Sequence, residues 1–327
     1  MKTSVVVPVY NEEGNLPELL QRLTAVMDAV GPYELVFVDD GSRDGSLAIL
    51  KQAAAARPDR IRVLELARNF GQHQAILAAF ENVSGDVVVT LDADLQNPPE
   101  EIPKLLAKIA EGYDVVGGVR QNRQDSFVRR AASALVNRVT VTITRMRITD
   151  FGCMLRAYSR DVIEEINRCD ESSTFIPALA QSFARRPTEI PVAHARRRHG
   201  ESAYSLYRLI RLNFDLMTGF SLLPLQVFGL LGTLVAFGGV AFGMFLFARR
   251  LIVGAEVEGV FTLFAILFTL LGVAIAGLGL VGEYVGRIYQ QVRGRPRFRV
   301  RHIYGLGASA APTPDSRLTT HDSRPRS

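Results

Sequence analysis

The sequence predicts an α/β domain built on a mostly parallel, doubly wound sheet, followed by an amphipathic interface helix and two transmembrane helices. Short β-branched and apolar runs alternate with amphipathic stretches through residues 4–119, which is the pattern of successive β-α units. Segments 216–248 and 259–282 contain no charged residue. Each segment is long enough to cross the roughly 30 Å hydrocarbon core of a bilayer as a helix.

The central strand of the predicted sheet is the continuous apolar run from Val87 to Leu91. Such a run, without polar alternation, is typical of a strand buried on both faces of a parallel sheet. Asn15 is predicted to cap the first helix, since asparagine is favoured at that position. Further strands are expected at 4–9, 34–38, 61–66 and 114–119, and helices at 16–30, 46–56, 72–80 and 100–111.

The second half of the chain is predicted to carry the membrane-associated elements. We expect helices at 128–144 and 172–185, a strand at 188–193, an amphipathic helix at 205–220 and a short helix near 283–292. These elements divide the chain into an α/β domain (1–200), an interfacial helix (201–221), two transmembrane helices with a short periplasmic loop (222–282), a basic juxtamembrane segment (283–304) and a disordered tail (305–327).

The formal net charge of +5 does not indicate a nucleic-acid partner, because the arginines gather beside the apolar segments. Arginines near both flanks place the α/β domain and both termini in the cytoplasm by the positive-inside rule, with anionic lipid as their partner. Arg249 and Arg250 in the connecting loop oppose this orientation and are partly offset by Glu256 and Glu258. The two cysteines suit a reducing compartment, and no cleavable signal peptide precedes the first strand.

Carboxylates follow two of the predicted strands. Asp92 and Asp94 end the central strand, and period-two geometry places them on the same side of the chain, where they suit Mg²⁺ or Mn²⁺. Asp39 and Asp40 end the second strand and could accept hydrogen bonds from ribose or from a base N–H. For both pairs the alternative is a polar, capped turn. The arginines after the fifth strand, Arg120 among them, either bind phosphate or belong to a solvated loop.

Taken together, the motifs at 7–12, 38–42, 68–73, 91–99 and 150–156 resemble those of family-two glycosyltransferases with the GT-A fold, in the polyprenyl-phosphate branch. The resemblance implies an inverting enzyme of the bacterial inner membrane that moves a sugar from a UDP-sugar to undecaprenyl phosphate, with Mg²⁺ or Mn²⁺ as cofactor. It also implies a homo-oligomer, a tetramer being one form. The strings at 71–73, 96–101, 119–126 and 173–177 favour a formylated aminoarabinose, used in lipid A modification and polymyxin resistance, over glucose or mannose.

The resemblance also assigns residues to roles. Metal binding falls to Asp92 and Asp94, with Asp94 the more direct ligand. The donor site comprises Pro8, Tyr10, Glu12, Asp39, Asp40, Asp92, Ala93, Asp94, Gln96, Arg120 and Arg123; the acceptor-phosphate site comprises Arg197, Arg198, Ser202 and Tyr204; and the catalytic residues are Asp150, Asp94 and Arg197. The second pKa of a phosphate monoester is about 6, so the acceptor is largely deprotonated at pH 7. We therefore expect Asp150 to orient a substrate rather than remove a proton.

One departure from the family pattern concerns the acceptor site. The pattern Arg-x-x-Gly-x-Ser-Lys-Tyr stands here at 197–204 with Ala203 in place of the lysine. That loss leaves open a binding protein that holds a nucleotide sugar without turnover. A processive polysaccharide synthase is disfavoured, because the Gln-x-x-Arg-Trp motif of that class needs a tryptophan and this chain has none. A Rossmann dehydrogenase is disfavoured, because no Gly-x-Gly-x-x-Gly follows the first strand.

Overall fold

The computed structural model describes residues 1–120, 150, 152–169, 175–195, 222–253, 260–293 and 296–305. These residues form two compact units, each of which is described by itself. The first is an α/β unit made of the described residues up to 195 together with 296–305. The second is helical and contains the described residues from 222 to 293.

The α/β unit is built on an eight-stranded sheet with the strand order β7-β5-β6-β4-β1-β2-β3-β8. Its strands are β1 (Thr3–Val9), β2 (Tyr33–Asp39), β3 (Ile61–Leu66), β4 (Val87–Thr90), β5 (Val115–Arg120), β6 (Arg156–Ser159), β7 (Pro187–Val192) and β8 (Val300–Tyr304). Strand β1 runs parallel to β2 and β4, β2 parallel to β3, and β5 parallel to β7. The mostly parallel sheet predicted from the sequence is therefore confirmed.

Strands β6 and β8 run against their neighbours. Strand β6 is antiparallel to both β4 and β5, and β8 is antiparallel to β3 at the edge of the sheet. The carboxyl ends of the other strands consequently meet at one edge of the sheet, where β6 and β8 begin. Ligands of doubly wound sheets bind at this edge.

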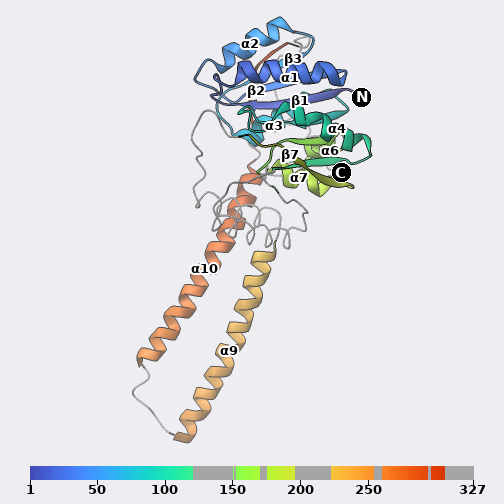
Figure 1. The fold of residues 1–327 in the computed structure, drawn as a ribbon. Helices are drawn as coiled ribbons and strands as arrows, with labels where there is room; N and C mark the ends of the chain where they lie inside the picture. Colours follow the sequence, from blue (N-terminus) through green and yellow to red (C-terminus); the bar gives the residue numbers. More distant parts are fainter. Residues whose placement is uncertain are drawn as a thin grey trace, which may run out of the picture. The chain divides into compact units, whose positions relative to one another are not determined.

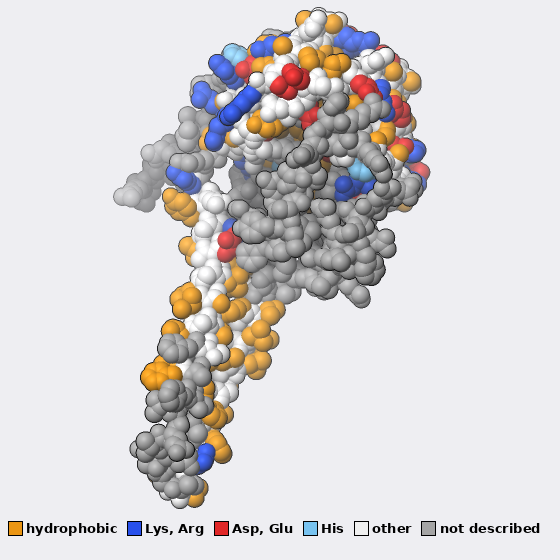
Figure 2. Space-filling model, turned by 60° about the vertical axis from the view of Figure 1, so that its left-hand side comes forward, with side chains coloured by type: hydrophobic (Ala, Val, Ile, Leu, Met, Phe, Trp, Pro, Cys, Tyr) orange, Lys and Arg blue, Asp and Glu red, His pale blue; other side chains and the backbone are white. Residues whose placement is uncertain are grey.

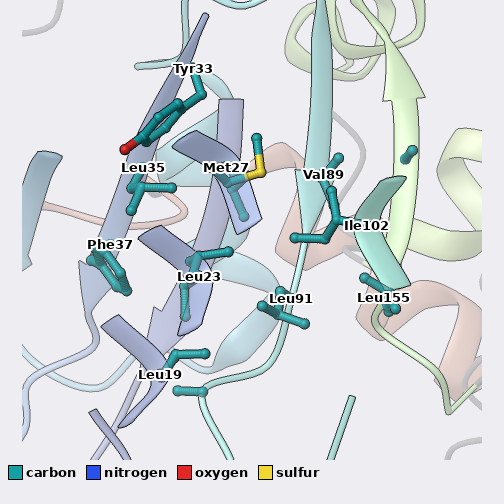
Figure 3. Close-up of a cluster of buried hydrophobic side chains, with 14 of the residues drawn as sticks. Leu19, Leu23, Met27, Tyr33, Leu35, Phe37, Val89, Leu91, Ile102 and Leu155 are labelled. Carbon is teal, nitrogen blue, oxygen red and sulfur yellow. The ribbon is translucent and has the colours of Figure 1, made fainter. Parts of the chain in front are cut away.

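Helices cover both faces of this sheet (Figure 1). They are α1 (Leu16–Val30), α2 (Ser46–Ala56), α3 (Gln72–Phe80), α4 (Ile102–Ala110), α6 (Arg160–Arg168) and α7 (Ile176–Phe183). One core cluster joins α1, α2 and α4 to the sheet, and a second joins α3, α6 and α7 to the opposite face. Figure 3 shows the first cluster, where Leu19 and Leu23 of α1 lie beside Leu35 and Phe37 of β2.

The alternation of side chains along β1 and β2 explains the two clusters. Val5 and Val7 face the first cluster, whereas Val6 between them faces the second. Because successive side chains of a strand point to opposite faces, a strand covered on both faces must be apolar throughout. The continuous apolar runs of the sequence are thus the cause of the layered architecture.

The helical unit consists of α9 (Leu223–Val253) and α10 (Val260–Val292). Each contains a segment long and apolar enough to cross a membrane, Leu225–Phe245 and Thr269–Gln290. Figure 2 shows hydrophobic side chains along the described parts of both helices, and almost none of the side chains in these segments is buried. Gly277 of α10 lies against the ring of Phe228 of α9.

Several sequence predictions need correction or lie outside the described residues. The short helix expected near 283–292 is the last part of the continuous helix α10. Asn15 occupies the N-cap of α1, but its side chain donates to Oε2 of Glu12 at 2.6 Å and makes no capping hydrogen bond. Strands β6 and β8 and helix α6 were not predicted. The helices expected at 128–144 and 205–220 and the tail beyond 305 lie outside the described residues.

Candidate functional site

The carboxyl edge of the sheet gathers polar side chains from strands that are far apart in the sequence. Asp39 lies at the end of β2, Asp92 and Asp94 follow β4, Arg120 ends β5, and Asp150 precedes β6. The register confirms this placement, since Asp39 pairs with Glu65 of β3 and Thr90 pairs with Arg156 of β6. These side chains form the candidate site.

Asp40 fastens two loops of this edge together. Its two carboxylate oxygens accept hydrogen bonds from the backbone N–H groups of Phe70 and Gly71 at 2.7 and 2.9 Å. Burial raises the pKa of Asp40, and the two backbone hydrogen bonds partly offset this effect. Asp40 thus links the end of β2 to the loop at Phe70 and Gly71, and its predicted contact with the nucleotide stays a prediction.

Asp39 is only 1% exposed, and its two carboxylate oxygens differ in their hydrogen bonds. Its Oδ2 accepts a hydrogen bond from the Ser42 N–H at 3.3 Å, whereas Oδ1 has no hydrogen-bond partner among the described residues. A buried oxygen without a donor costs free energy unless a ligand supplies one. Burial raises the pKa of Asp39 above its ordinary value, against the hydrogen bonds from Ser42. Oδ1 of Asp39 is therefore suited to accept a hydrogen bond from an N–H or O–H group of a ligand.

A cavity of about 370 Å³ lies beside Asp39. It is lined by Tyr10, Asp39, Gly41, Ser42, Arg43, Leu47, Glu65, Leu66, Ala67, Arg68, Asn69 and Arg301. Tyr10 is 43% exposed, so its ring is accessible for the stacking of a flat ligand. Of the residues predicted for the donor, Tyr10 and Asp39 line this cavity, whereas Pro8, Glu12 and Asp40 do not.

Three arginines of this cavity, Arg43, Arg68 and Arg301, were not predicted as site residues. Arg68 stands in one of the recognised motifs, and its guanidinium lies 4.7 Å from the centre of the Phe70 ring. The proximity of Arg43 to the Asp39–Ser42 turn could have suggested it. No local signal points to Arg301, because it reaches the cavity through the pairing of β8 with β3.

Gly41 allows the turn after β2 to pack against the loop after β3. Its φ of +72° lies in the left-handed region, and a Cβ atom at this position would come within 2.7 Å of the Arg68 backbone carbon. Only glycine meets both demands without displacing backbone. The loop after β1 is tied to the same turn, because Oγ of Ser46 accepts a hydrogen bond from the Glu12 N–H at 2.9 Å.

The loop after β4 presents two carboxylates to solvent. Strand β4 ends at Thr90, so Asp92 and Asp94 lie in the turn that follows it and not in the strand geometry assumed for them; both are half-buried, whereas Ala93 between them is buried. Oδ1 of Asp92 accepts a hydrogen bond from Gln72 Nε2 at 2.5 Å, and Oδ1 of Asp94 accepts one from the Gln96 N–H at 3.1 Å. Leu95 adopts φ of 60°, a left-handed conformation that costs about 1 kcal/mol or more for leucine.

The donor atoms at this loop suit a hard divalent cation. Among the described residues no group of three or more His, Cys, Asp or Glu side chains could hold a metal ion. Two half-exposed carboxylates are the protein contribution expected for Mg²⁺ or Mn²⁺ when phosphate oxygens and water supply the remaining ligands. Asp92 and Asp94 therefore fit the metal that the sequence predicts.

Asp150 is held in a fixed orientation by Arg120. Arg120 Nε and Nη2 donate to the two carboxylate oxygens of Asp150, each at 2.7 Å, and Gly152 N–H adds a bond of 3.1 Å. The Asp150 side chain is only 4% exposed and that of Arg120 17%. A Cβ at Gly152 would come within 2.6 Å of Arg120 Nη2. Arg120, predicted to face phosphate, thus contacts Asp150 through both carboxylate oxygens.

The buried residue Arg156, which is only 1% exposed, supports the backbone at Asp150. Arg156 donates from Nη2 to the Asp150 carbonyl at 2.6 Å and from Nε to the Cys153 carbonyl at 2.9 Å. Burial raises the pKa of the Cys153 thiol to about 11, so this cysteine is protonated at neutral pH. Arg156 therefore holds the Asp150 and Cys153 carbonyls from a buried position.

His73 lies near the start of α3 and packs edge-on against Phe175 at 5.1 Å between ring centres. Its Nδ1 has no hydrogen-bond partner among the described residues. Removal from solvent lowers the pKa of His73 to about 4, so the ring is neutral at physiological pH. These contacts indicate that His73 packs α3 against Phe175.

The predicted acceptor-phosphate residues and Arg123 lie outside the described residues. The chain is described up to Ala195, three residues beyond the end of β7, and the predicted residues Arg197, Arg198, Ser202 and Tyr204 come after it. Ala195 N–H donates to the Gln96 carbonyl at 2.8 Å. The chain therefore enters the acceptor motif from a position fastened to the loop that carries Asp94.

Comparisons with known proteins cover the part of the chain that carries this site. The sequence model of glycosyl transferase family 2 matches residues 4–167, about half of the chain. Among solved structures, the chain is similar to glucosyl-3-phosphoglycerate synthase from Mycobacterium tuberculosis in complex with Mn²⁺, UDP and phosphoglyceric acid, with 19% identity, a TM-score of 0.49 and coverage of 67% of this chain and 76% of that chain. It is also similar to S. aureus TarS 1-349 in complex with UDP-GlcNAc, with 22% identity, a TM-score of 0.44 and coverage of 66% of each chain.

Proposed function

The chain belongs to glycosyltransferase family 2, and on this premise we propose that it transfers 4-deoxy-4-formamido-L-arabinose from UDP to undecaprenyl phosphate at the cytoplasmic face of a bacterial inner membrane. The product would serve lipid A modification and so resistance to polymyxin. The α/β unit carries the donor site, and α9 and α10 are long and apolar enough to hold it at a membrane where a lipid acceptor is available.

The observation that carries the proposal is the meeting of three kinds of group at one edge of the sheet. Asp39 offers an acceptor oxygen, without a partner in the described part of the chain, beside a cavity of about 370 Å³. Asp92 and Asp94 offer carboxylates suited to a metal–diphosphate, and Asp150 is held by Arg120 near the start of β6. A nucleoside diphosphate sugar needs recognition of its base, charge compensation on its diphosphate and orientation of its sugar. We assign these tasks to Asp39, to the metal held by Asp92 and Asp94, and to Asp150.

The transfer is a displacement at the anomeric carbon. A phosphate oxygen of undecaprenyl phosphate forms the new bond to that carbon, the bond to the β-phosphate oxygen of UDP breaks with its electron pair, and the configuration inverts. A divalent cation bound by Asp92 and Asp94 would supply charge compensation for the departing diphosphate. The acceptor is largely deprotonated at pH 7, since its second pKa lies near about 6, so the step needs no strong base.

The residues of the chain then act mainly by position. Asp150, whose carboxylate is held by Arg120 and whose carbonyl is held by Arg156, orients the sugar or the acceptor. Arg197 and Arg198 are proposed to bind the acceptor phosphate, because cationic groups reduce the repulsion between two approaching anions. The hydrogen bond from the Ala195 N–H to the Gln96 carbonyl supports this role, because it fastens the residue two positions before Arg197 to the loop of Asp94.

The proposed sugar rests on the sequence strings at 71–73, 96–101, 119–126 and 173–177. The experiment is transfer from a panel of radiolabelled UDP-sugars to undecaprenyl phosphate by the purified full-length protein, with Mg²⁺, with Mn²⁺ and with chelator. We expect metal-dependent labelling of the lipid from the formamido-arabinose donor, which Asp94→Asn abolishes. Labelling from UDP-glucose or another hexose donor alone would replace the proposed sugar.

A non-catalytic nucleotide-sugar-binding protein is the second candidate, and Ala203 is the observation that favours it. Tight UDP binding without labelled lipid from any donor would support this alternative. Ala203→Lys, which restores the residue of the family pattern, is then the variant to assay. Gain of transfer by this variant would locate the defect in the acceptor site.

A further inference from the structure

We propose that strand β8, which follows the second apolar helix, completes the nucleobase pocket, with Arg301 donating a hydrogen bond to a carbonyl oxygen of the base beside Asp39. The docking of this strand and the binding of the nucleotide are then coupled. This inference rests on the proposed function, because it assigns a further residue to the same donor site.

The first supporting observation is the position of β8. Residues Val300–Tyr304 pair antiparallel with Val63–Leu66 of β3, and Ala67 N–H donates to the Arg299 carbonyl at 2.9 Å. Arg301 thereby reaches the lining of the cavity that Asp39 and Tyr10 share. A segment far along the chain, beyond both apolar helices, thus supplies part of the wall of the donor site.

The second observation is the charge arrangement around Glu65. Glu65 is the register partner of Asp39, so two carboxylates lie side by side. Glu65 Oε2 accepts from Tyr304 Oη at 2.8 Å and contacts Lys51 Nζ at 3.3 Å, and its Oε1 lies 3.7 Å from Arg301 Nη1. Burial opposes ionisation of Glu65, but the hydrogen bonds from Tyr304 and Lys51 outweigh it and leave its pKa below the ordinary value.

The contrast between the two carboxylates indicates what the pocket recognises. Glu65 is satisfied, largely by β8, whereas Oδ1 of Asp39 is buried without a partner among the described residues. The edge of uracil presents a carbonyl, an N–H and a second carbonyl in a row. This edge is matched by a carboxylate, which accepts from the N–H, and by a neighbouring guanidinium, which donates to a carbonyl. Asp39 and Arg301 are such a pair. The Arg301 side chain is 65% exposed and only loosely paired at 3.7 Å, so it can turn to a ligand at little cost.

The test compares UDP and UMP binding to full-length protein in detergent by isothermal titration calorimetry. Arg301→Gln should weaken both ligands by the same factor, about three- to tenfold, as expected for one hydrogen bond. Arg299→Gln is the matched control, because it removes the same charge two residues away, from an exposed side chain that does not line the cavity. The control should bind like the natural protein.

The coupling has its own measurement. By linkage, UDP should slow amide hydrogen exchange in Val300–Tyr304 of the natural protein, and this protection should be smaller in Arg301→Gln. Exchange in the ligand-free variant shows whether β8 still pairs with β3. If β8 no longer pairs with β3 in Arg301→Gln, Arg301→Lys is used in its place. Lysine keeps the charge and a donor, so this variant should bind UDP with intermediate affinity.

The outcomes separate the two proposals. Natural protein that binds no UDP contradicts the proposed function. UDP binding that Arg301→Gln leaves unchanged, with no protection of β8, overturns this inference and leaves the proposed function intact. Weakening of UDP without weakening of UMP would place Arg301 on the diphosphate and would equally overturn the contact with the base.

Discussion

Asp39 combines burial, an oxygen without a hydrogen-bond partner among the described residues and a raised pKa, and we expect this combination to make UDP binding depend on pH. Only the ionised carboxylate is a pure acceptor for a base N–H. Since the pKa of Asp39 is raised by burial, the carboxylate protonates at a higher pH than an ordinary aspartate. UDP affinity should therefore fall as the pH falls through this raised pKa.

The measurement for Asp39 is the Kd of UDP between pH 4.5 and 8, compared with that of Asp39→Asn. The comparison removes the titration of UDP itself, and the ratio of the two affinities should rise with pH. A constant ratio would contradict the acceptor role. The sign for folding is opposite: the folded protein keeps this proton to higher pH, so the contribution of Asp39 to the free energy of unfolding decreases as the pH rises between the ordinary and the raised pKa.

Asp150 gives a second prediction at the scale of the residue. We expect Asp150→Asn to reduce single-turnover transfer by about 10- to 100-fold through loss of orientation, while the pH–rate profile keeps its shape. The profile should still follow the acceptor phosphate, whose second pKa is about 6. Asparagine keeps an oxygen that can accept from Arg120, which makes it the mildest available change.

The control for Asp150 is Asp114→Asn, at a carboxylate that accepts hydrogen bonds from the Arg185 and Arg186 backbone at the amino end of β5. This variant should leave the transfer rate unchanged. If Asp150→Asn abolished transfer as completely as Asp92→Asn, and an ionisation vanished from the profile with it, Asp150 would be a general base.

Among the elements, we expect the turn after β2 to shape the proposed donor pocket. Gly41→Ala should lower the free energy of unfolding by about 1–3 kcal/mol, because alanine is strained at φ of +72° and its Cβ would displace the backbone of Arg68. UDP affinity should fall as well, since the same loop supplies the donors to Asp40. Thermal unfolding and calorimetric titration of the variant measure the two effects.

Gly31→Ala separates conformational strain from steric displacement. Gly31 also has a positive φ, +135°, but a Cβ there would meet nothing within 4 Å. This variant should lose stability without losing UDP affinity. Equal losses of affinity in the two variants would mean that the turn after β2 does not shape the pocket.

The elements that the sequence predicts are those whose pattern is local. The parallel strands appear as apolar runs, and Asp39, Asp92 and Asp94 could be assigned to the site because each closes such a run. Strand β6 has no such pattern, since its four residues include the buried Arg156. Strand β8 contains Arg301 and His302 and forms only because β3 offers an unpaired edge.

The same distinction applies to the site. Tyr10 and Asp39 follow or end a predicted strand, and both line the cavity. Asp40 stands beside Asp39 but turns to the backbone of Phe70 and Gly71, which no spacing rule reveals. The pairing of Arg120 with Asp150 joins two loops thirty positions apart. Tertiary pairing, rather than local pattern, decides such contacts.

At the scale of the whole molecule, the orientation in a membrane follows from the distribution of charge. Arginines flank the two apolar segments at the ends that adjoin the α/β unit in the sequence. At the other ends, Arg249 and Arg250 lie in the last turns of α9 and not in the connecting loop as predicted, and Glu256 and Glu258 follow them in the sequence. Because the larger basic excess stays in the cytoplasm, we expect the α/β unit inside and residues 254–259 on the periplasmic side.

Cysteine labelling in spheroplasts measures this orientation, and the natural cysteines make the experiment simple. Cys153 is buried, with a pKa raised to about 11 by that burial, so it will not react with maleimide at neutral pH. Only the half-buried Cys169 must be replaced, by serine. In this background Ala255→Cys should react with a membrane-impermeant maleimide in intact spheroplasts.

Asp59→Cys is the matched reporter on the α/β unit, where the natural side chain is 78% exposed. It should react only after lysis. The reversed pattern would place the α/β unit outside the cytoplasm, where UDP-sugars are not made, and would remove the donor from reach of Asp39. Protection of both cysteines until lysis would show that α9 and α10 do not span the bilayer, and the lipid acceptor would then have to be reached from the surface of the membrane.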